Sequence, residues 1–558
     1  MAILHSLKIK NFRGILEFEQ SFKQGLICII GRGDSGKSTI LDAISYVLSS
    51  SWNINFYDSD FYNCQVEKPI EIEATLKSLP NKILTKFGMY IRGIKEDGIV
   101  IDDMESDEAQ KAEPAISIRL TVTKNLEPVW EVVSYRGQES INISAADRAK
   151  LNVSIMSDYS ERHFSLSKGN PLYSLCKQLE NEDSDEENVI LEILRETKKD
   201  IDNNVSVKFE NVIAKVKETS SNLGISTNNL ATNIDHRDIS IKENKVCLHE
   251  ENIPLRLKGK GSKRIMSLAI QIAVANPDGI ILIDEIEQGL EPDRVQHLVN
   301  ILKSYANFQV FFTTHSSNVI VELTVSDIFV MRKNETKLLA IGEELQGCIR
   351  RNPESFFAKK VIICEGATEI GICRALNDYI QKIGKKSFTY LGIYLADGTG
   401  SNMIQYAEGF KSLGFDICLL CDSDVQAINA QKSQLNYEII DCQNEFAMEQ
   451  QLFADLSWDS IIEMINYRMT SDNVENKSIF DSVYSIQNTK PIFSTNWYQN
   501  ESDELRKLLG NMAKKKEWYK RIDHGQKMGE LIFSEFENLS NDKRIKQMFQ
   551  RLIDWIDK

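Results

Sequence analysis

The spacing of hydrophobic residues predicts buried strands that are each followed by a polar turn and a helix. The run Leu26-Ile27-Cys28-Ile29-Ile30 is apolar throughout, as in a strand buried on both faces, and a helical pattern begins at Ile40. Similar apolar runs lie at 279–283, 310–313, 360–364 and 416–421. Because strands alternate with helices in both halves of the chain, we predict an α/β protein with a parallel sheet in each half.

The stretch between the first groups of strands has a different character. Residues 68–156 are rich in β-forming residues, which predicts a mixed sheet appended to the first α/β core. Residues 158–235 are polar and helical, with an acidic cluster from Glu180 to Glu187 and heptad-like apolar spacing from Val189 to Val216. This segment is predicted to be an inserted helical arm, either a solvated surface hairpin or a dimerisation element. A junction between the two halves is expected over residues 341–358.

The composition narrows the range of partners. The 558 residues include 66 Lys+Arg and 81 Asp+Glu, a formal net charge of −15 that would repel nucleic acid from the molecule as a whole. A non-specific nucleic-acid coat is therefore excluded, and contact with DNA or RNA requires a local basic strip or bound metal ions.

Several features predict a cytoplasmic protein without a membrane partner. No apolar run approaches the ~20 residues that span a bilayer, and the first residues lack the charged-then-apolar order of a signal peptide. The ten cysteines are scattered, some of them within apolar runs, as in a reduced compartment. Cys418 and Cys421 lie three apart on a predicted strand, so they face opposite sides and are not expected to share a metal or a disulfide.

The first predicted strand leads into a phosphate-binding loop. The loop fits G-x-x-x-x-G-K-[ST], with the strand before it and the helix after it that this motif requires. Its glycines let backbone N–H groups face the phosphates, while Lys37 is expected to contact the β- and γ-phosphates and Ser38 to ligate Mg²⁺. The predicted ATP-binding residues of the loop are Gly31, Gly33, Asp34, Ser35, Gly36, Lys37, Ser38 and Thr39.

Residues at the ends of two later strands complete the predicted ATPase site. Asp284 is expected to belong to the ATP-binding site, where it holds the coordination shell of the Mg²⁺ ion. Glu285 is expected to polarise the attacking water. The alternative is that both carboxylates cap the next helix. His315 follows the apolar run 310–313, where a catalytic histidine that senses the γ-phosphate would emerge, and a purely structural role is the alternative.

These motifs resemble an ABC-type ATPase head of the chromosome-maintenance and recombination-protein kind. Beside the phosphate loop, the resemblance rests on residues 7–14 (LKIKNFRG), 283–287 (IDEIE) and 314–316 (THS). It implies that residues 257–264 (LKGKGSKR) occupy the place of the signature loop, with positive charge added to the usual Leu-Ser-Gly-Gly. In such heads the signature loop of one protomer covers ATP bound to the other, which implies a dimer. Residues 58–61 lie in the glutamine-loop region without matching that motif.

Acidic residues at strand ends in the second half predict another chemical site. Glu365 follows the run 360–364, and Asp422 and Asp424 follow the run 416–421. Both groups are expected at the carboxyl ends of parallel strands, where the two aspartates of an extended Asp-x-Asp point to one side and suit a shared divalent cation. Glu369, four residues after Glu365 at helical spacing, can face the same cluster. The alternative is a helix-capping glutamate beside an acidic turn.

This second pattern resembles the Toprim fold of topoisomerases, primases and certain nucleases. A Toprim domain after an ABC head is similar to the overcoming-lysogenization-defect (OLD) nuclease family, either Gabija-nuclease-like or retron-effector-like. The resemblance implies that Glu365, Asp422 and Asp424 bind the principal Mg²⁺ or Mn²⁺ and that Glu369 and Glu449 serve a second ion. Two ions would activate water and stabilise the leaving oxygen in phosphodiester hydrolysis.

The same family uses a C-terminal lysine to offset charge on the phosphate. The strip 514–527 is basic and carries Trp518, a composition that suits a nucleic-acid backbone with stacked bases, although a solvated helix face is the alternative. Lys520 is the first candidate for the catalytic lysine and Lys527 the second, and their spacing does not decide between them. Asp397 is expected to shape the loop beside the metals.

These assignments give the expected organisation of the chain. An ABC-type ATPase domain is expected at residues 1–157 and 236–350, interrupted by the helical dimerisation arm at 158–235. A C-terminal Toprim nuclease domain with helical insertions is expected at residues 351–558. ATP with one Mg²⁺ or Mn²⁺ is expected at the first site and two such ions at the second.

The leading functional hypothesis is a metal-dependent DNA endonuclease regulated by an ABC-type ATPase domain and acting in anti-phage defence. One alternative is an ATPase scaffold or sensor that binds nucleic acid without cleaving it. Another is a topoisomerase or primase, for which no nucleophilic tyrosine on a DNA-binding module and no zinc module is recognised in the sequence. The expected partners are DNA, a homodimer or higher homo-oligomer, and an operon partner such as a helicase or a reverse transcriptase with its noncoding RNA.

Overall fold

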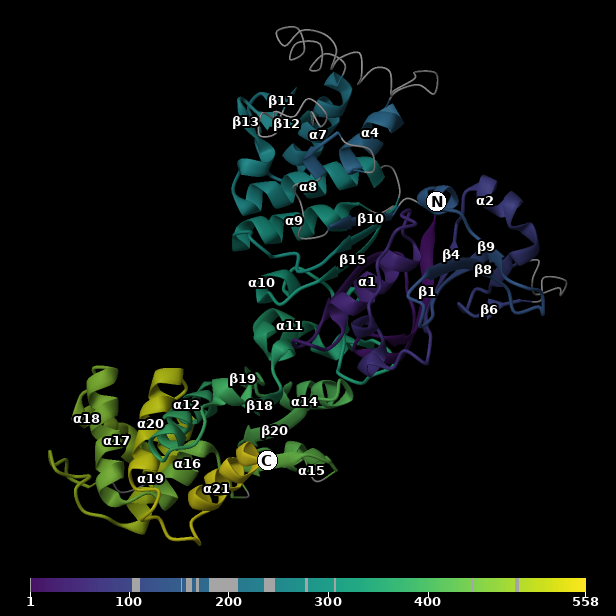
Figure 1. Ribbon diagram of the computed structural model, residues 1–558. Helices are drawn as coiled ribbons and strands as arrows, with labels where there is room; N and C mark the ends of the chain where they lie inside the picture. Colours follow the sequence, from purple (N-terminus) through teal and green to yellow (C-terminus); the bar gives the residue numbers. More distant parts are fainter. Residues whose placement is uncertain are drawn as a thin grey trace. The chain divides into compact units, whose positions relative to one another are not determined.

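A computed structural model gives the arrangement of the chain (Figure 1). The chain divides into two compact units, Met1–Ile341 and Gly342–Lys558, so the division falls at the start of the junction expected over residues 341–358. The structure describes residues 2–102, 111–151, 153–156, 163–166, 170–179, 209–234, 246–275, 279–305, 308–432, 434–443, 445–486 and 491–558. None of the helices in these ranges combines the length and the apolar character that crossing a membrane requires.

A six-stranded sheet forms the centre of the first unit. Its order is β10-β14-β15-β3-β16-β17, and its pairs are parallel except the last, which confirms the parallel sheet predicted for this half. Its central strands β14, β15 and most of β3 are buried, as parallel strands covered on both faces must be. They are β3 (Gly25–Ile30), β10 (Val153–Met156), β14 (Ile280–Ile283), β15 (Gln309–Thr313), β16 (Ile328–Val330) and β17 (Leu339–Ala340).

The helices of the first unit connect these strands or pack beside them. They are α1 (Lys37–Val47), α2 (Asn81–Lys86), α3 (Ala145–Ala149), α4 (Pro171–Leu179), α7 (Glu210–Asn222), α8 (Lys260–Ala275), α9 (Pro292–Ser304) and α10 (Ser317–Ile320). Short 3-10 turns lie at η1 (Asp58–Asp60), η2 (Tyr62–Cys64), η3 (Gly88–Tyr90), η6 (Leu255–Leu257) and η7 (Val325–Asp327).

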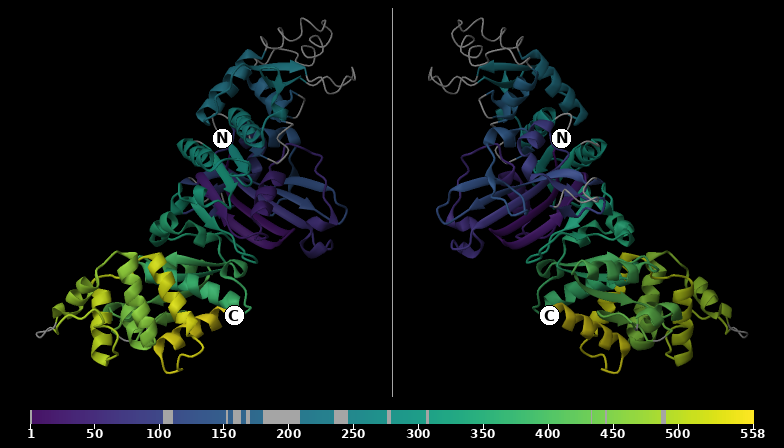
Figure 2. Two further views of the ribbon diagram at one scale, coloured as in Figure 1. Left: turned by 90° about the vertical axis from the view of Figure 1, so that its left-hand side faces the viewer. Right: turned by 90° about the vertical axis from the view of Figure 1, so that its right-hand side faces the viewer.

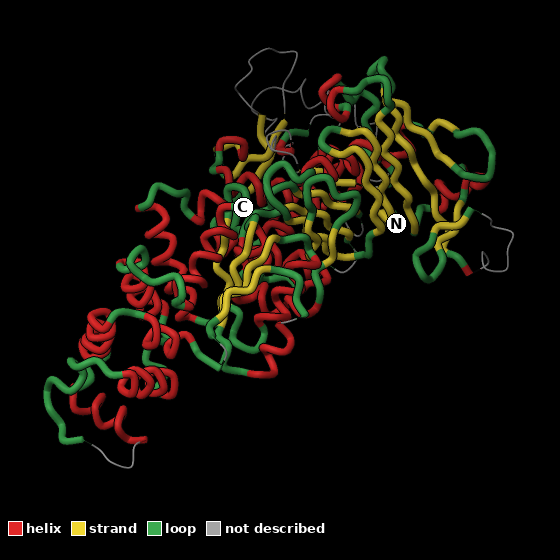
Figure 3. Tube along the Cα trace, turned by 90° about the horizontal axis from the view of Figure 1, so that it is seen from below, coloured by secondary structure: helices red, strands yellow, loops and turns green. Residues whose placement is uncertain are grey.

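The β-rich residues of the first unit form an eight-stranded antiparallel sheet, not the mixed sheet expected over residues 68–156. The difference arises because the first two strands of the chain join this sheet, while β10 joins the parallel one. Figure 3 shows its strands side by side next to the N-terminus. They are β1 (Ile3–Phe12), β2 (Ile15–Ser21), β4 (Ile70–Lys77), β5 (Arg92–Ile94), β6 (Val100–Ile101), β7 (Glu113–Val122), β8 (Pro128–Val133) and β9 (Ile141–Asn142).

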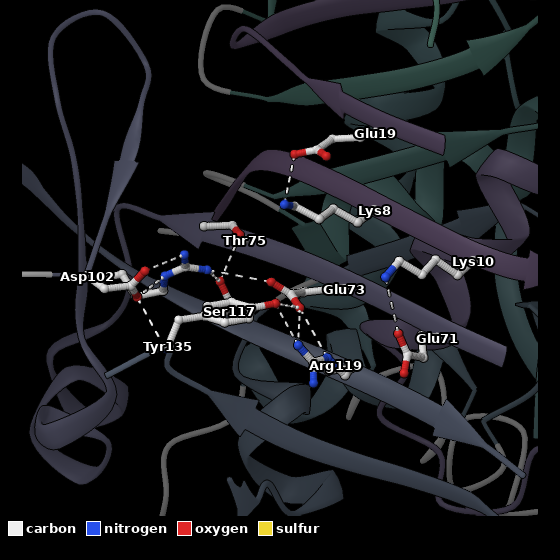
Figure 4. A network of polar contacts seen from close by, with 11 residues as sticks. Lys8, Lys10, Glu19, Glu71, Glu73, Thr75, Asp102, Ser117, Arg119 and Tyr135 are labelled. Atoms are coloured by element: carbon white, nitrogen blue, oxygen red, sulfur yellow. Dashed lines mark hydrogen bonds and ion pairs between the residues drawn. The ribbon is translucent and has the colours of Figure 1, made fainter. Parts of the chain in front are cut away.

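One face of this antiparallel sheet is polar (Figure 4). Lys8 pairs with Glu19 at 2.9 Å across neighbouring strands, an exposed contact that contributes little to stability. Deeper in the same network, the buried carboxylate of Glu73 lies 2.8 Å from Arg119 and 3.6 Å from Arg92. Since an unpaired charge buried at this position would be costly, the two arginines are required for the sheet to close over Glu73.

Part of the predicted arm packs against α8. Helices α4 and α7 share a buried apolar cluster with α8, which includes Leu172, Val212, Val216 and Ile270. A small antiparallel sheet of β11 (Leu230–Ile234), β12 (Val246–Glu250) and β13 (Ile253–Pro254) lies in the same region. The acidic cluster from Glu180 to Glu187 and most of the heptad-like spacing lie outside the described residues.

The second unit is built on a four-stranded parallel sheet of order β19-β18-β20-β21, as predicted for this half. Its strands are β18 (Lys360–Cys364), β19 (Ile393–Asp397), β20 (Asp416–Cys421) and β21 (Glu438–Asp441). Cys418 and Cys421 are buried in β20 and free. Helices α16 to α20 gather beside this sheet, as Figures 1 and 2 show.

The second unit is mostly helical outside its sheet. Its helices are α11 (Gln346–Arg351), α12 (Ala367–Lys382), α13 (Phe388–Leu391), α14 (Met403–Ser412), α15 (Gln426–Lys432), α16 (Met448–Asp455), α17 (Trp458–Ser471), α18 (Asn476–Val483), α19 (Asp503–Lys515), α20 (Ile522–Ser534) and α21 (Arg544–Asp557). Three 3-10 turns accompany them, η8 (Glu343–Leu345), η9 (Pro353–Phe357) and η10 (Tyr484–Ile486).

Glycines allow α12 and α20 to cross in close contact. A Cβ atom on Gly371 of α12 would lie 2.3 Å from the carbonyl oxygen of Ile522, and one on Gly525 of α20 would lie 2.3 Å from the carbonyl oxygen of Thr368. Gly529 continues the contact one turn further along α20. The backbones therefore touch, and the two helices are fixed relative to each other.

We expect Gly371→Ala to destabilise the second unit by roughly 1–3 kcal/mol, because the new methyl group meets backbone atoms that cannot rotate away. This loss should exceed the ~1 kcal/mol that alanine gains in helix propensity. Differential scanning calorimetry should record a fall of about 2–4 °C per kcal/mol in the transition of this unit. Gly88→Ala, which introduces a methyl group into open space, is the matched control. Equal melting of Gly371→Ala and wild type would show that the crossing is not tight.

Candidate nucleotide and metal sites

The predicted phosphate loop joins β3 to α1 in the first unit. Gly31 has φ 153°, and a Cβ atom there would lie 2.4 Å from the carbonyl oxygen of Met331. Gly36, at the start of α1, has φ 100° in the left-handed region. Both positions therefore require glycine, and the loop curls back toward the helix N-terminus as a phosphate site needs.

The lysine and serine of the loop are held inside the first unit. Lys37 Nζ donates to the carbonyl oxygens of Gly31 at 2.9 Å and Arg32 at 2.8 Å. Burial lowers the pKa of Lys37, and the negative charge of Asp284 opposes that shift. Ser38 Oγ donates to Asp284 Oδ1 at 3.2 Å, so the two residues predicted to share Mg²⁺ lie together.

Asp284 and Glu285 follow β14 and lie beside the loop. Thr313, at the end of β15, donates its hydroxyl to Asp284 Oδ1 at 2.5 Å and accepts from the Glu285 backbone N–H at 2.8 Å. Glu285 has φ 47° and an exposed side chain. The next helix, α9, begins after Glu291, so neither acid caps it and the capping alternative is wrong.

His315 lies on a loop that belongs to the same region. The side chain of Glu287 accepts from the His315 backbone N–H at 2.6 Å and from Thr314 Oγ1 at 2.7 Å. The His315 side chain is exposed. Glu287 thus fixes the loop that carries the histidine, a role that the sequence did not reveal.

The segment in the place of the signature loop leads into α8. A Cβ atom on Gly261 would lie 2.6 Å from the Gly289 carbonyl oxygen, so the start of α8 touches the turn after Glu285. Arg264, one of the added basic residues, donates to the Glu285 carbonyl oxygen at 2.7 Å and also bonds Gln288. Part of the added charge therefore fixes the α8 N-terminus to the residues that follow β14.

In the second unit, three carboxylates meet at the carboxyl edge of the parallel sheet. Glu365 follows β18 and Asp422 and Asp424 follow β20, and these strands are neighbours. Ligand oxygens of the three residues lie within 4.8 Å of one another. Glu365 Oε2 accepts from the Asp422 backbone N–H, and Asp422 Oδ1 accepts from the Met448 backbone N–H, each at 2.8 Å. The sequence-predicted acids are thus brought together on fixed backbone.

Two further acids are buried behind this cluster. Glu369, in the first turn of α12, accepts from the Gly366 backbone N–H at 2.9 Å through Oε2. Its Oε1 atom and the Oε2 atom of Glu449 are buried and have no hydrogen-bond partner among the described residues. Lys520 Nζ lies 3.3 Å from Glu449 Oε1.

Comparison with known proteins covers both units. A family model of the AAA ATPase domain matches residues 1–320, and one of the overcoming lysogenization defect protein-like TOPRIM domain matches residues 356–424. The chain belongs to the OLD family of ATPase–Toprim proteins.

Individual relatives of this OLD-family chain each align with about three fifths of it. An "ATP/GTP phosphatase" of Helicobacter pylori is 24% identical in an alignment 387 residues long, which covers 62% of this chain and 95% of that protein. An Smc head bound to the C-terminal domain of ScpA from Pyrococcus furiosus is 14% identical, with a TM-score of 0.39 over 62% of this chain and 98% of its own. The recombination mediator RecF with ATP is 15% identical, with a TM-score of 0.35 over 61% of this chain and 98% of its own.

The carboxylates of the OLD-family Toprim unit are hard to ionise together. Burial raises the pKa of Asp422 to about 9, and the charges of Glu369 and Glu365 add to this rise. Burial also raises the pKa of Glu369 to about 7, although the positive charge of Lys520 opposes it. For Lys520, burial alone would lower the pKa, but the charges of Glu449, Glu369 and Asp422 raise it. A protonated lysine and partly protonated acids therefore coexist near neutral pH.

The structure separates the two candidate lysines. Lys520 lies beside the buried Glu449, whereas Lys527 pairs with Glu463 at 2.6 Å and lies 3.9 Å from Glu530. The placement favours Lys520 for the catalytic role, and that role stays a prediction.

Three residues near the acids were not singled out from the sequence. Lys514 Nζ lies 2.8 Å from Asp424, and the buried Lys432 donates to the Asp422 carbonyl oxygen. Asn352 is hydrogen-bonded in both directions to the backbone of Asp397, which was expected to shape the nearby loop. Lys514 lies in the basic strip of the sequence, but Lys432 and Asn352 carry no pattern that sequence reasoning could use.

The donor set fits a hard divalent cation. Oxygen ligands from Glu365, Asp422 and Asp424 converge, and the buried Glu369 Oε1 and Glu449 Oε2 atoms have no hydrogen-bond donor within the described residues. In the first unit, Ser38 and Asp284 offer a hydroxyl and a carboxylate oxygen in the arrangement that nucleotide-bound Mg²⁺ requires.

In the metal-free protein, the stability of the second unit is expected to fall as the pH rises from about 5 to about 9. Carboxyl groups of the unfolded chain titrate near pH 4, while folded Glu369 and Asp422 keep their protons to about pH 7 and about pH 9. This contribution to stability is full below pH 4 and is lost as the pH passes through the folded pKa values. Mg²⁺ should reduce the fall, because a bound cation favours the ionised forms. Thermal unfolding with EDTA and with Mg²⁺ across this range measures the effect.

Two variants separate this effect from the rest of the molecule. Glu369→Gln removes one titrating group and should give a shallower fall than wild type. Glu408→Gln, at an exposed position on α14, should keep the wild-type slope. Stability that is flat or that rises with pH in the metal-free wild type would contradict the raised pKa values.

Proposed function

We propose that the protein is a metal-dependent DNA endonuclease whose cleavage is regulated by its ABC-type ATPase unit. The observation that carries the proposal is the convergence of Glu365, Asp422 and Asp424 at the carboxyl edge of the Toprim sheet, beside buried acids and a charged lysine. An ATPase domain joined to a Toprim domain of the OLD type supports an ATP-dependent nuclease.

Each side chain has a distinct part in the proposed hydrolysis. Glu365, Asp422 and Asp424 hold the principal Mg²⁺ or Mn²⁺, and Glu369 and Glu449 serve a second ion. Divalent ions in such a site activate water and stabilise the leaving oxygen. Lys520, protonated because of its acidic surroundings, offsets the charge that grows on the phosphate.

In the ATPase unit, Lys37 and the loop N–H groups bind the phosphates while Ser38 and Asp284 hold the Mg²⁺. Glu285, whose backbone is held by Thr313, orients the attacking water. His315 senses the γ-phosphate from the loop that Glu287 fixes. A dimer, in which the 257–264 segment of one protomer covers ATP on the other, remains part of this proposal.

A short connection supports regulation of one unit by the other. Strand β17 of the first unit ends at Ala340, and η8 of the second unit begins at Glu343. From there the chain passes through α11 to Asn352, whose amide donates to the Asp397 carbonyl at 3.0 Å and accepts from the Asp397 N–H at 2.9 Å. Asp397 precedes a loop in which the Gly400 N–H donates to the Glu365 carbonyl. These contacts within the second unit connect its first residues to the metal ligand Glu365.

The biological setting is proposed from the family. DNA of an invading phage is the proposed substrate, and a helicase or a reverse transcriptase with noncoding RNA is the proposed operon partner. The net charge of −15 agrees with a protein that binds DNA only where metal and local cations offset it.

Nicking of a supercoiled plasmid with Mg²⁺ or Mn²⁺ tests the proposed function. Wild type should nick, while Asp422→Asn should reduce nicking to background, because it removes a carboxylate ligand at the centre of the cluster. Asp416→Asn changes the same residue type at the exposed, opposite end of β20 and should cut like wild type. ATP should alter the wild-type rate and leave that of Lys37→Ala unchanged.

The outcomes of this assay discriminate the alternatives. If wild type leaves the plasmid intact under every nucleotide condition, the result would favour the alternative, an ATPase that binds nucleic acid without cleaving it. Religated topoisomers instead of nicks would indicate a topoisomerase.

The two candidate lysines predict opposite results in the same assay. Lys520→Ala should lower kcat on the order of 10²–10³-fold, because a positive charge aimed at the reacting phosphate is lost. Lys527→Ala should cut normally, because the ammonium group of Lys527 pairs with Glu463 and Glu530 and not with the proposed metal-binding carboxylates. Thermal unfolding in Mg²⁺ checks that Lys520→Ala is folded. A larger loss for Lys527→Ala would reverse the assignment.

A further inference from the structure

A pocket of about 410 Å³ lies between α16 and α19 in the second unit. The two helices approach closely at its base, where a Cβ atom on Gly510 would lie 3.2 Å from Gln450 Cα. The spacing of the two helices at this point is therefore set by close backbone contact. The lining residues are Phe446, Gln450, Ala454, Asp503, Arg506, Lys507, Gly510 and Asn511.

The pocket borders the loop that carries the metal ligands. The Phe446 carbonyl oxygen accepts from the backbone N–H of Ser423, which lies between Asp422 and Asp424, at 2.9 Å. Further along α19, beyond the residues that line the pocket, Lys514 Nζ lies 2.8 Å from Asp424. Asn511 is three residues before Lys514 on α19, about 4.5 Å along the helix axis. Through Phe446, the pocket therefore adjoins the loop that carries Asp422 and Asp424.

The lining offers one flat apolar surface and a pair of amides. Phe446 is half-buried and provides an aromatic ring. Gln450 Nε2 donates to Asn511 Oδ1 at 2.7 Å, and Gln450 Oε1 accepts from the Ala447 N–H at 2.9 Å. Asn511 Nδ2 has no hydrogen-bond partner in the part of the chain that the structure describes, so it can donate to a ligand. An aromatic ring beside amide donors and acceptors is the chemistry that recognises a nucleobase.

The charged residues that line the same pocket are two cations, Arg506 and Lys507, and one acid, Asp503. Arg506 is fixed by hydrogen bonds to the carbonyl oxygens of Phe453 and Leu456, each at 2.9 Å, and pairs with Glu501. Lys507 is exposed and has no ion-pair partner within the described ranges. Lys507, Asn511 and Lys514 share one face of α19, since they are spaced i, i+4 and i+7. This face leads from the pocket to Asp424 and suits a phosphate backbone.

We propose that the pocket between α16 and α19 binds one nucleobase of the cleaved DNA strand next to the scissile phosphate, and that Asn511, held in place by Gln450, selects adenine there. The proposal rests on the nuclease function proposed above. Phe446 stacks on the base, and Lys507 contacts the adjoining phosphate. Adenine is the expected base because paired donor and acceptor groups of Asn and Gln match its N6 and N7 edge.

Sequencing the ends produced by plasmid nicking tests the selection. Wild type should show an adenine preference at one position flanking the cut, and Asn511→Ala should abolish it while raising KM for preferred sites by about 5- to 100-fold. Lys507→Ala should weaken cleavage of all sequences alike and reduce the slope of log affinity against log salt by about one. Asn538→Ala, an exposed asparagine elsewhere in the unit, is the matched control. Thermal unfolding verifies that each variant is folded.

A binding assay separates failure of the pocket from failure of the nuclease. An oligonucleotide that carries photoreactive 8-azidoadenine is crosslinked to Asp422→Asn and the adduct is mapped by mass spectrometry. Adducts on peptides that contain Phe446 or Asn511 support the pocket even if wild type proves unable to nick. Adducts only elsewhere overturn it. Nicking by wild type without base preference, or with a preference that Asn511→Ala retains, overturns the selection of adenine and leaves the proposed nuclease intact.

Discussion

Repulsion between carboxylates held at one edge of a small sheet is the constraint around which the second unit is built. Two charges 4 Å apart interact by about 4 kcal/mol in surroundings with an effective dielectric constant near 20. Oxygens of Glu365, Asp422 and Asp424 lie within 4.8 Å of one another, with Glu369 buried nearby. The sheet edge is therefore stable only if protons, ammonium groups or metal ions offset this repulsion. The raised pKa values of Asp422 and Glu369 indicate that bound protons offset part of this repulsion.

The C-terminal helices supply the ammonium groups. Lys514 comes from the last turn of α19, and Lys520 lies just before α20. The backbone next to Lys520 is fixed, because the Tyr519 carbonyl accepts from Thr368 Oγ1 at 2.9 Å and the buried Tyr519 hydroxyl donates to the Met464 carbonyl at 3.1 Å. Thr368 precedes Glu369 on α12, so the glycine-mediated crossing of α12 and α20 also sets the distance between this lysine and the buried acids. Helices far from the sheet in sequence are thereby part of the site.

The sequence could predict the elements whose position depends on local pattern. The phosphate loop and the strand-end acids were located because parallel strands bring their carboxyl ends to one edge, a rule that needs only strand assignment. Spacing could not decide between Lys520, the first candidate, and Lys527, the second, because their positions depend on the backbone contact at Gly371 and Gly525. The order of the strands and the antiparallel pairing of the first sheet depend on long-range contacts in the same way.

Other contributors in the ATPase unit were missed for a related reason. Glu287 acts through a hydrogen bond to the backbone of His315, and Arg264 acts through the carbonyl oxygen of Glu285. The geometry of the turns determines which backbone groups such side chains contact, so these contacts cannot be predicted from residue type alone. The roles of Glu287 and Arg264 can be recognised only once the structure shows which strand ends lie together.

The net charge of −15 can be reconciled with a nucleic-acid substrate through the distribution of charge in the second unit. Of the cations near the acids, Lys514 and Lys520 lie in the last turn of α19 and on the segment that follows it, while the buried Lys432 ends α15. Lys514 and Lys520 are engaged by Asp424 and Glu449, so little of their charge is available to a phosphate until the acids find another cation. Divalent metal would thus both offset the repulsion among the acids and release lysines for the backbone of the DNA. On this reasoning metal binding and DNA binding are linked, and the acidity of the molecule works against cleavage wherever metal is absent.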